Sequence, residues 1–307
     1  MIKRLISSNK IPFLILALLV VVGIAFATRG GNNSSNGQGT KSTETPQYLS
    51  FEGNYIFDVP KSHLVDEQSV PGAQLVYTGQ LNAKTLEDVY TAGGISLHPL
   101  SDLTDHSSKG FKDYVNDHYV PELKKNLSSN DVQANFDKQD GQDVVRIDLK
   151  KDGKAFRHIY LKGGQHPAAV IAKQDSSTFK EIEKTLKDVE KSDINDEVAD
   201  IKQAVQSTAQ LVKDQKAKEL YAAAAPELRE KSSEAELTNA MKTAKPYSDG
   251  NIIISGVSYV PNEFSTAVRF IKLDKNDQQP GYGELNFKKL DGQWKIQTIS
   301  LPTPKTP

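Results

Sequence analysis

The chain contains no cysteine, and this absence limits both its chemistry and the way it is stabilised. Thiol nucleophiles and thiolate metal sites are excluded, and a lipoprotein is excluded because its lipid would need a cysteine. A disulfide scaffold is excluded as well. The 307 residues must therefore be held together by hydrophobic cores of ordinary size, and their number suffices for about two domains.

Histidine is absent after His166, so the last part of the chain has no imidazole for acid-base catalysis. The six histidines are His63, His98, His106, His118, His158 and His166. No pair of them has the His-x-His or His-x-x-x-His spacing of a metal site, and no HExxH motif occurs. Phosphate loops, GxSxG motifs and EF-hand patterns are also missing. We therefore expect no catalytic residue, no metal site and no cofactor.

A basic surface is missing from the body of the chain. The net charge is minus 1, but residues 1–47 carry plus 4 and residues 302–307 carry plus 1, which leaves minus 6 for residues 48–301. An acidic body has no face on which to neutralise phosphates, so nucleic acid is not an expected partner.

Long apolar runs are also scarce, and the one that is present, Ile11–Thr28, organises the chain. Its eighteen uncharged residues would span roughly 27 Å as a helix, which matches the hydrocarbon core of a bilayer. Positive charges precede it within Met1–Lys10, so that tail should remain in the cytoplasm. We expect a single-pass cell-membrane protein with a transmembrane signal anchor, the bilayer as its partner and its body outside.

A cleaved signal peptide is the alternative to the anchor. Ala25, Phe26 and Ala27 form the small-x-small pattern after which signal peptidases cut, and cleavage would give a secreted protein. In either case Arg29–Gln47, which has no aliphatic or aromatic residue, is expected to be a flexible linker with a reach of roughly 25 Å.

The next segment, Tyr48–Lys191, has the pattern of an α+β domain. A strand with alternating Tyr55, Phe57 and Val59 ends at Pro60. Further strands are predicted at Ala73–Thr78, Gly94–Leu97, Val132–Asp137, Asp143–Leu149 and Ala155–Leu161. Helices are predicted at Ser108–Tyr119, where Pro121 would interrupt, and at Ser177–Val189. The Asp-Gly pair at residues 152 and 153 predicts a tight hairpin.

The stretch FEGNYIFDVPKSH at residues 51–63 resembles the opening of PsbP-like domains, although His63 lies near the position where that family often has tryptophan. The resemblance covers about residues 48–191. It implies an αβα sandwich that serves as an accessory or binding module in exported proteins, and it transfers no site residue.

The last folded segment, Ile194–Leu301, has helices first and strands afterwards. Apolar residues spaced by three and four predict a long helix from Ile194 to Val212, and Ser233 with Glu236 predicts a capping box for a later one. Four β-rich runs follow and predict an antiparallel meander. They end in Asp291-Gly-Gln-Trp-Lys-Ile296, a hairpin that is similar to the end of the nuclear transport factor 2-like family. That resemblance implies a cone-shaped α+β domain, followed by a disordered tail at Pro302–Pro307.

Two sets of side chains could carry function in this second domain. Aromatic residues could line a pocket in the cone, namely Tyr221, Tyr247, Phe270, Tyr282 and Trp294, or they could simply fill it. Glu284 could act as a lone acid or base, but a cross-strand ion pair with Arg269 is the simpler interpretation.

Together these features favour a non-enzymatic accessory protein outside the cell membrane that binds a protein partner or an envelope polymer. The alternative is a small-molecule-binding protein or an enzyme that uses the cone pocket of the second domain.

Overall fold

The structure is a computed structural model, and it describes residues 45–67, 73–78, 85–100, 108–127, 131–248, 251–271 and 281–302. The expected membrane segment Ile11–Thr28 lies outside these residues. Within the described part of the chain, no helix is long and apolar enough to cross a membrane. The expected α+β class with antiparallel sheets is confirmed, since the described strands form two sheets in which each pairing is antiparallel.

The chain divides into two compact units whose boundaries differ from the expected ones. Unit 1 is Val59–Lys184, and unit 2 combines the described parts of Ser42–Asp58 and Thr185–Pro307. Unit 1 is therefore an insertion in the sequence of unit 2. The range Tyr48–Lys191, expected to be one domain, has both of its ends in unit 2 because each end contributes strands to the unit 2 sheet.

The sheet of unit 2 runs in the order β10-β2-β1-β12-β13-β14-β15, and β11 pairs separately with β13. Its strands are β1 (Gln47–Ser50), β2 (Tyr55–Asp58), β10 (Lys187–Asp188), β11 (Asn251–Ile253), β12 (Gly256–Val260), β13 (Glu263–Ile271), β14 (Gly281–Leu290) and β15 (Gln293–Ser300). The predicted meander from β12 to β15 is confirmed. The β1-β2 hairpin extends it, with Leu49 opposite both Ile56 and Val257.

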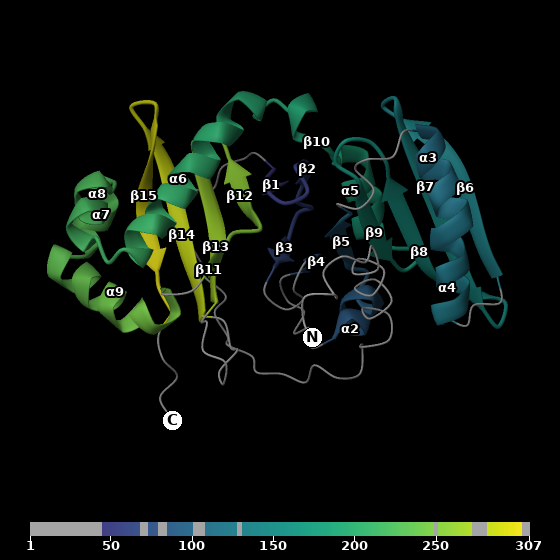
Figure 1. Ribbon diagram of the computed structural model, residues 1–307, viewed down its shortest axis with the longest axis horizontal. Coiled ribbons are helices and arrows are strands. Elements are labelled where there is room, and N and C mark those ends of the chain that lie inside the picture. Colours follow the sequence, from purple (N-terminus) through teal and green to yellow (C-terminus); the bar gives the residue numbers. More distant parts are fainter. Residues whose placement is uncertain are drawn as a thin grey trace, which may run out of the picture. The chain divides into compact units, whose positions relative to one another are not determined.

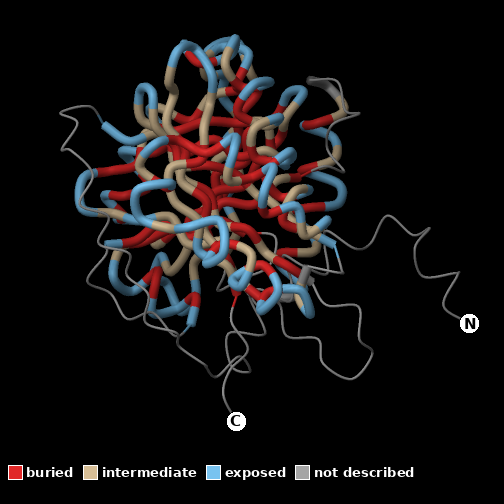
Figure 2. The backbone as a smooth tube through the Cα atoms, turned by 90° about the vertical axis from the view of Figure 1, so that its left-hand side faces the viewer, coloured by how far each residue is buried: buried red, intermediate tan, exposed pale blue. Residues whose placement is uncertain are grey.

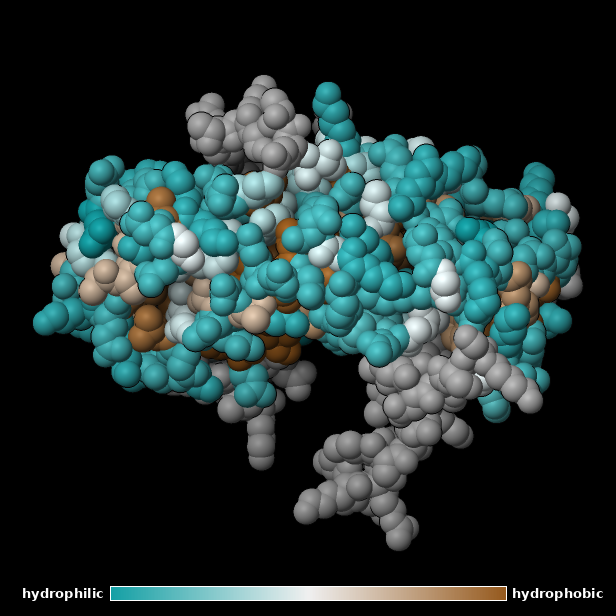
Figure 3. All heavy atoms as spheres, turned by 90° about the horizontal axis from the view of Figure 1, so that it is seen from above, coloured by the Kyte–Doolittle hydropathy of each residue, from teal (hydrophilic) through white to brown (hydrophobic). Residues whose placement is uncertain are grey.

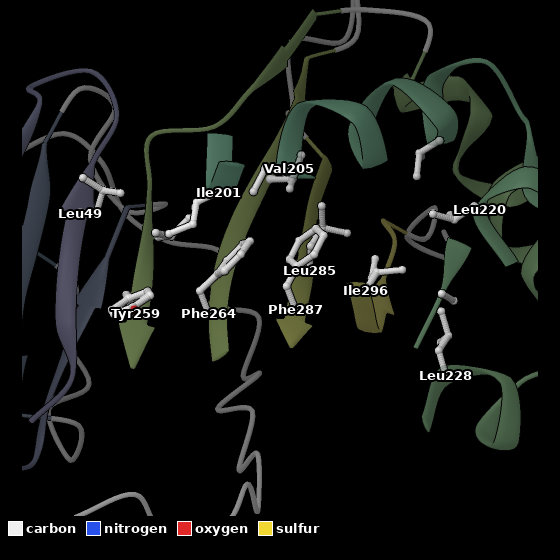
Figure 4. Close-up of a cluster of buried hydrophobic side chains, with 14 of the residues drawn as sticks. Leu49, Ile201, Val205, Leu220, Leu228, Tyr259, Phe264, Leu285, Phe287 and Ile296 are labelled. Atoms are coloured by element: carbon white, nitrogen blue, oxygen red, sulfur yellow. The ribbon is translucent and has the colours of Figure 1, made fainter. Parts of the chain in front are cut away.

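Four helices of unit 2 precede the meander, and α6 crosses the face of its strands (Figure 1). They are α6 (Asn195–Lys213), α7 (Ala217–Ala223), α8 (Pro226–Lys231) and α9 (Glu234–Ser248). Ile201 and Val205 of α6 face Phe264 and Leu285 of the sheet in one buried cluster (Figure 4). The predicted capping box of α9 is confirmed, because the Glu236 amide donates to Ser233 Oγ at 3.2 Å and the Ser233 amide donates to Glu236 Oε2 at 2.7 Å.

The sheet of unit 1 runs in the order β3-β4-β5-β9-β8-β7-β6. Its strands are β3 (His63–Asp66), β4 (Gln74–Thr78), β5 (Ile95–Pro99), β6 (Asp131–Gln139), β7 (Gln142–Lys151), β8 (Lys154–Lys162) and β9 (Ala168–Ala172). The predicted hairpin between β7 and β8 is confirmed, with positive φ at Asp152 (53°) and Gly153 (74°) as a two-residue primed turn requires. Strands β3 and β9 were not predicted.

Helices cover both faces of the unit 1 sheet. They are α2 (Leu86–Thr91), α3 (Ser108–Tyr114), the π-helical segment η2 (Val115–Tyr119), α4 (Val120–Leu127) and α5 (Ser177–Thr185). Phe111 and Val115 share a buried cluster with Ile159 and Leu161 of β8. Tyr160 lies between these two strand residues, so its side chain is on the opposite face of the sheet. Phe179 of α5 packs on Tyr160 and therefore covers that face. Figure 2 shows buried segments in the interior of the chain and exposed segments at its outer turns.

Both helices predicted for this part of the chain are present, but they end at other residues than predicted. Pro121 does not interrupt the first helix; the chain widens to a π-helical turn, with the Val120 amide bonded to the Val115 carbonyl, and continues as α4. A proline lacks the N–H and crowds the preceding turn, and one wide turn relieves that conflict. The second helix, α5, stops at Thr185 instead of Val189, because Lys187 and Asp188 pair with β2 as strand β10.

Candidate functional site

Two of the five predicted pocket residues lie at one end of the unit 2 core, where they fill space. Phe270 is buried, and its ring borders Gly283, while the ring of Tyr247 borders Gly281. A Cβ atom at Gly281 would lie 2.8 Å from the Tyr247 ring, and one at Gly283 would lie 3.1 Å from the Phe270 ring. The glycines thus let two aromatic rings lie directly on strand β14.

Trp294 lies in a second aromatic group farther along the same sheet. Its ring meets Phe264 edge-on at a centroid distance of 4.8 Å and Tyr259 at 6.4 Å. Phe264 in turn stacks on Phe287 at 4.5 Å, and these two rings lie side by side beneath α6 (Figure 4). This end of the core is also occupied by rings in close contact.

The remaining two predicted residues point elsewhere. Tyr282 alternates with Gly281 and Gly283 on β14, so its side chain is on the sheet face opposite the helices, across from Arg269. Tyr221 is half-buried on α7, and its hydroxyl donates to the Arg229 carbonyl at 3.4 Å. The five aromatic residues therefore do not converge on a single site.

The predicted ion pair between Arg269 and Glu284 is not formed. Ala267 is opposite Glu284, so Arg269 is its diagonal neighbour. The Glu284 carboxylate accepts from Asn286 Nδ2 at 3.3 Å, and the buried Nε of Arg269 has no partner among the described residues. Glu284 shares this face with Asn286 and Thr298, whose side chains are joined by a 2.6 Å hydrogen bond.

Lys289 connects two residues of unit 2 that have unused hydrogen-bonding groups, and we call the three residues the Trp294 cluster: Glu197, Lys289 and Trp294. Lys289 Nζ lies 3.2 Å from Glu197 Oε1 and 5.5 Å from the centre of the Trp294 ring. Glu197 Oε2 and Trp294 Nε1 are both buried and have no partner among the described residues. Indole N–H groups and carboxylate oxygens that are buried normally have partners, so these two atoms mark a candidate binding site.

A second lysine-glutamate pair lies next to this cluster in sequence. Lys288 Nζ is 3.2 Å from Glu227 Oε1, and Glu227 Oε2 is also buried and unpartnered in the described part of the chain. A hydrogen bond from its own backbone N–H, together with the Lys288 ammonium, lowers the pKa of the Glu227 carboxyl. No aromatic ring stacks with this pair in the described contacts, and that distinguishes it from the Trp294 cluster.

The histidines described in unit 1 are separate and have individual surroundings. His98 Nε2 lies 2.8 Å from Ser96 Oγ, which is also 2.8 Å from the Tyr90 hydroxyl, and all three residues are buried. Burial lowers the pKa of His98 to about 4, so its ring is neutral near pH 7. His158 Nδ1 pairs across strands with Asp148 at 2.6 Å. Among the described residues, no three histidines or carboxylates are grouped so that they could hold a metal ion.

Part of the Trp294 cluster could have been found from the sequence. Asp291-Gly292 is a two-residue turn, so Lys289 and Trp294 must be opposite each other on the hairpin. Glu197 comes from the first turn of α6, and no local pattern connects it to that hairpin. The chain matches no protein-family model, and it matches no curated protein.

Proposed function

We propose that the chain is a membrane-anchored extracytoplasmic accessory protein that binds a protein partner or an envelope polymer without catalysing a reaction. The observation that carries this proposal is the aromatic packing inside unit 2, where Phe264 and Phe287 stack at 4.5 Å between helices and sheet. An interior occupied by side chains leaves recognition to groups at the surface. The surface seen in Figure 3 is mostly hydrophilic, with small hydrophobic patches.

The proposed location outside the cell membrane rests on the apolar stretch Ile11–Thr28 and the polar linker after it.

For the fold, we propose that unit 1 is an αβα sandwich similar to PsbP-like domains and that unit 2 is a cone similar to the nuclear transport factor 2-like family. Helices on both sides of the unit 1 sheet support the first assignment, but the strand that carries the PsbP-like resemblance, Tyr55–Asp58, belongs to unit 2. Helices followed by a meander support the second.

The alternative is a small-molecule-binding protein or enzyme that uses the cone. A ligand there would need the volume that Phe264, Phe287 and Tyr247 occupy. The aromatic packing therefore argues against it, and the contrast can be tested by changing the interior alone.

The test uses the full-length chain on intact cells. Added protease should remove the body and leave a small N-terminal fragment protected, because the body is outside. In a separate experiment, cross-linking on intact cells that have not been treated with protease should capture the same partner with the wild-type chain and with Phe287→Leu. That substitution only opens interior space. A protected body, or capture that is lost specifically when Phe287 is replaced, contradicts the proposal.

A further inference from the structure

The Trp294 cluster is electrically balanced yet incomplete in its hydrogen bonding. Lys289 neutralises Glu197 through Oε1, so the cluster attracts neither anions nor cations strongly. Two capacities remain unused: Glu197 Oε2 can accept a hydrogen bond, and Trp294 Nε1–H can donate one. A neutral group that both donates and accepts a hydrogen bond can satisfy both atoms and leave the ion pair in place.

A hydroxyl group has both properties. We propose that the Trp294 cluster binds a neutral, hydroxyl-rich ligand, a saccharide unit of an envelope polymer, and this rests on the proposed function of the chain as an extracytoplasmic binding protein. Sugar hydroxyls donate to Glu197 Oε2 and accept from Trp294 Nε1–H, and the apolar C–H groups of the ring pack on the aromatic side chains. Apolar surface with a few fixed polar groups is the usual composition of a small-ligand site.

The side chains that carry the two atoms are accessible even though the atoms themselves are buried. The side chain of Glu197 is 33% exposed, and Trp294 is only partly buried. The terminal torsion of a glutamate is broad and two-fold, so rotation of the carboxylate exchanges the paired and the unpaired oxygen. The proposal requires that small rearrangements of these partly exposed side chains bring the donor and the acceptor to the surface.

The chain offers a direct optical test because Trp294 is its single tryptophan. The full-length chain, in a detergent without sugar head groups, is titrated with two neutral probes, chitotriose and maltotriose, and with inorganic phosphate as a charged probe. We expect a saturable change in tryptophan emission with at least one trisaccharide and none with phosphate. Glu197→Gln replaces the carboxylate oxygen with an amide, and binding should weaken about tenfold or more.

Glu227→Gln is the matched control, because Glu227 is also paired with a lysine, is also partly exposed and also has an unpartnered oxygen. Its trisaccharide affinity should equal that of the wild type. Equal weakening by both substitutions, a response to phosphate alone, or no saturable response to either sugar up to about 10 mM overturns the proposal. If sugars fail but cross-linking on cells still captures the same partner with Glu197→Gln, the saccharide site is wrong and the proposed function stands.

Discussion

The backbone amide of Asp58 donates a hydrogen bond to the hydroxyl of Thr185 at 3.1 Å, although the two residues are 127 positions apart. They are the points at which the chain of unit 2 leaves for unit 1 and returns from it. The pairing of β2 with β10 continues from this contact, with Lys187 opposite Ile56. Unit 2 is therefore one scaffold assembled from two distant parts of the chain, and the Trp294 cluster belongs to it.

Leu49 should be important for the stability of unit 2. It is fully buried between Ile56 and Val257, so Leu49→Ala should reduce the free energy of unfolding by roughly 2–5 kcal/mol. Chemical denaturation followed by Trp294 fluorescence reports on unit 2 specifically. Leu149→Ala removes an equally buried leucine from unit 1 and is the control. The prediction is wrong if Leu149→Ala shifts the tryptophan transition more than Leu49→Ala does.

Gly281 should not tolerate even a methyl group. A Cβ atom there would lie 2.7 Å from Pro302 and 2.8 Å from the Tyr247 ring, so Gly281→Ala should cost roughly 1–3 kcal/mol of stability. The double variant Gly281→Ala/Tyr247→Leu should recover part of the loss, because the smaller side chain frees the space of the ring. Denaturation of the wild type, Gly281→Ala, Tyr247→Leu and the double variant gives the coupling energy between the two positions. A coupling of zero would show that the ring is not the obstacle.

His98 should make the protein less stable in acid. Its pKa is about 4 when folded and 6.5 ordinarily, so the unfolded chain binds a proton that the folded chain does not. The stabilisation from its neutral ring is therefore complete above pH 6.5 and is lost as the pH falls towards 4, by roughly 3 kcal/mol at most. Unfolding free energies between pH 7.5 and 4.5 should fall less steeply for His98→Gln than for the wild type. Parallel slopes for the two proteins would refute this role.

Local patterns predicted most individual elements of this fold. The Asp152-Gly153 turn, the apolar spacing of α6 and the Ser233 capping box each depend on neighbours within a few positions, and each is present. Domain membership depends on distant pairing instead. Nothing near Leu49 in sequence indicates that it pairs with Val257, so the N-terminal hairpin was assigned to the wrong unit.

The candidate site could be predicted only in part, because it too depends on contacts between distant residues. The sequence predicts Trp294 as a possible binding residue. Alternation on β14 places Tyr282 on the opposite face, and Gly281 and Gly283 bring aromatic rings onto the strand where the sequence predicts a possible pocket. Glu197 reaches the cluster from a helix, and its contact with Lys289 is a tertiary one. Such contacts carry no signature in the sequence.

The most direct test of the account is to excise unit 1. Two glycines replace residues 59–184 and join Asp58 to Thr185, whose backbone and side chain are already in contact. This chain is compared with a fragment of residues 194–301, the range expected from the sequence, which lacks β1, β2 and β10. We predict a cooperative, Trp294-detected unfolding transition for the joined chain and a much weaker one, or none, for the fragment, since Val257 loses its partner Leu49. A fragment as stable and cooperative as the joined chain would contradict the claim that both parts of the chain build one scaffold.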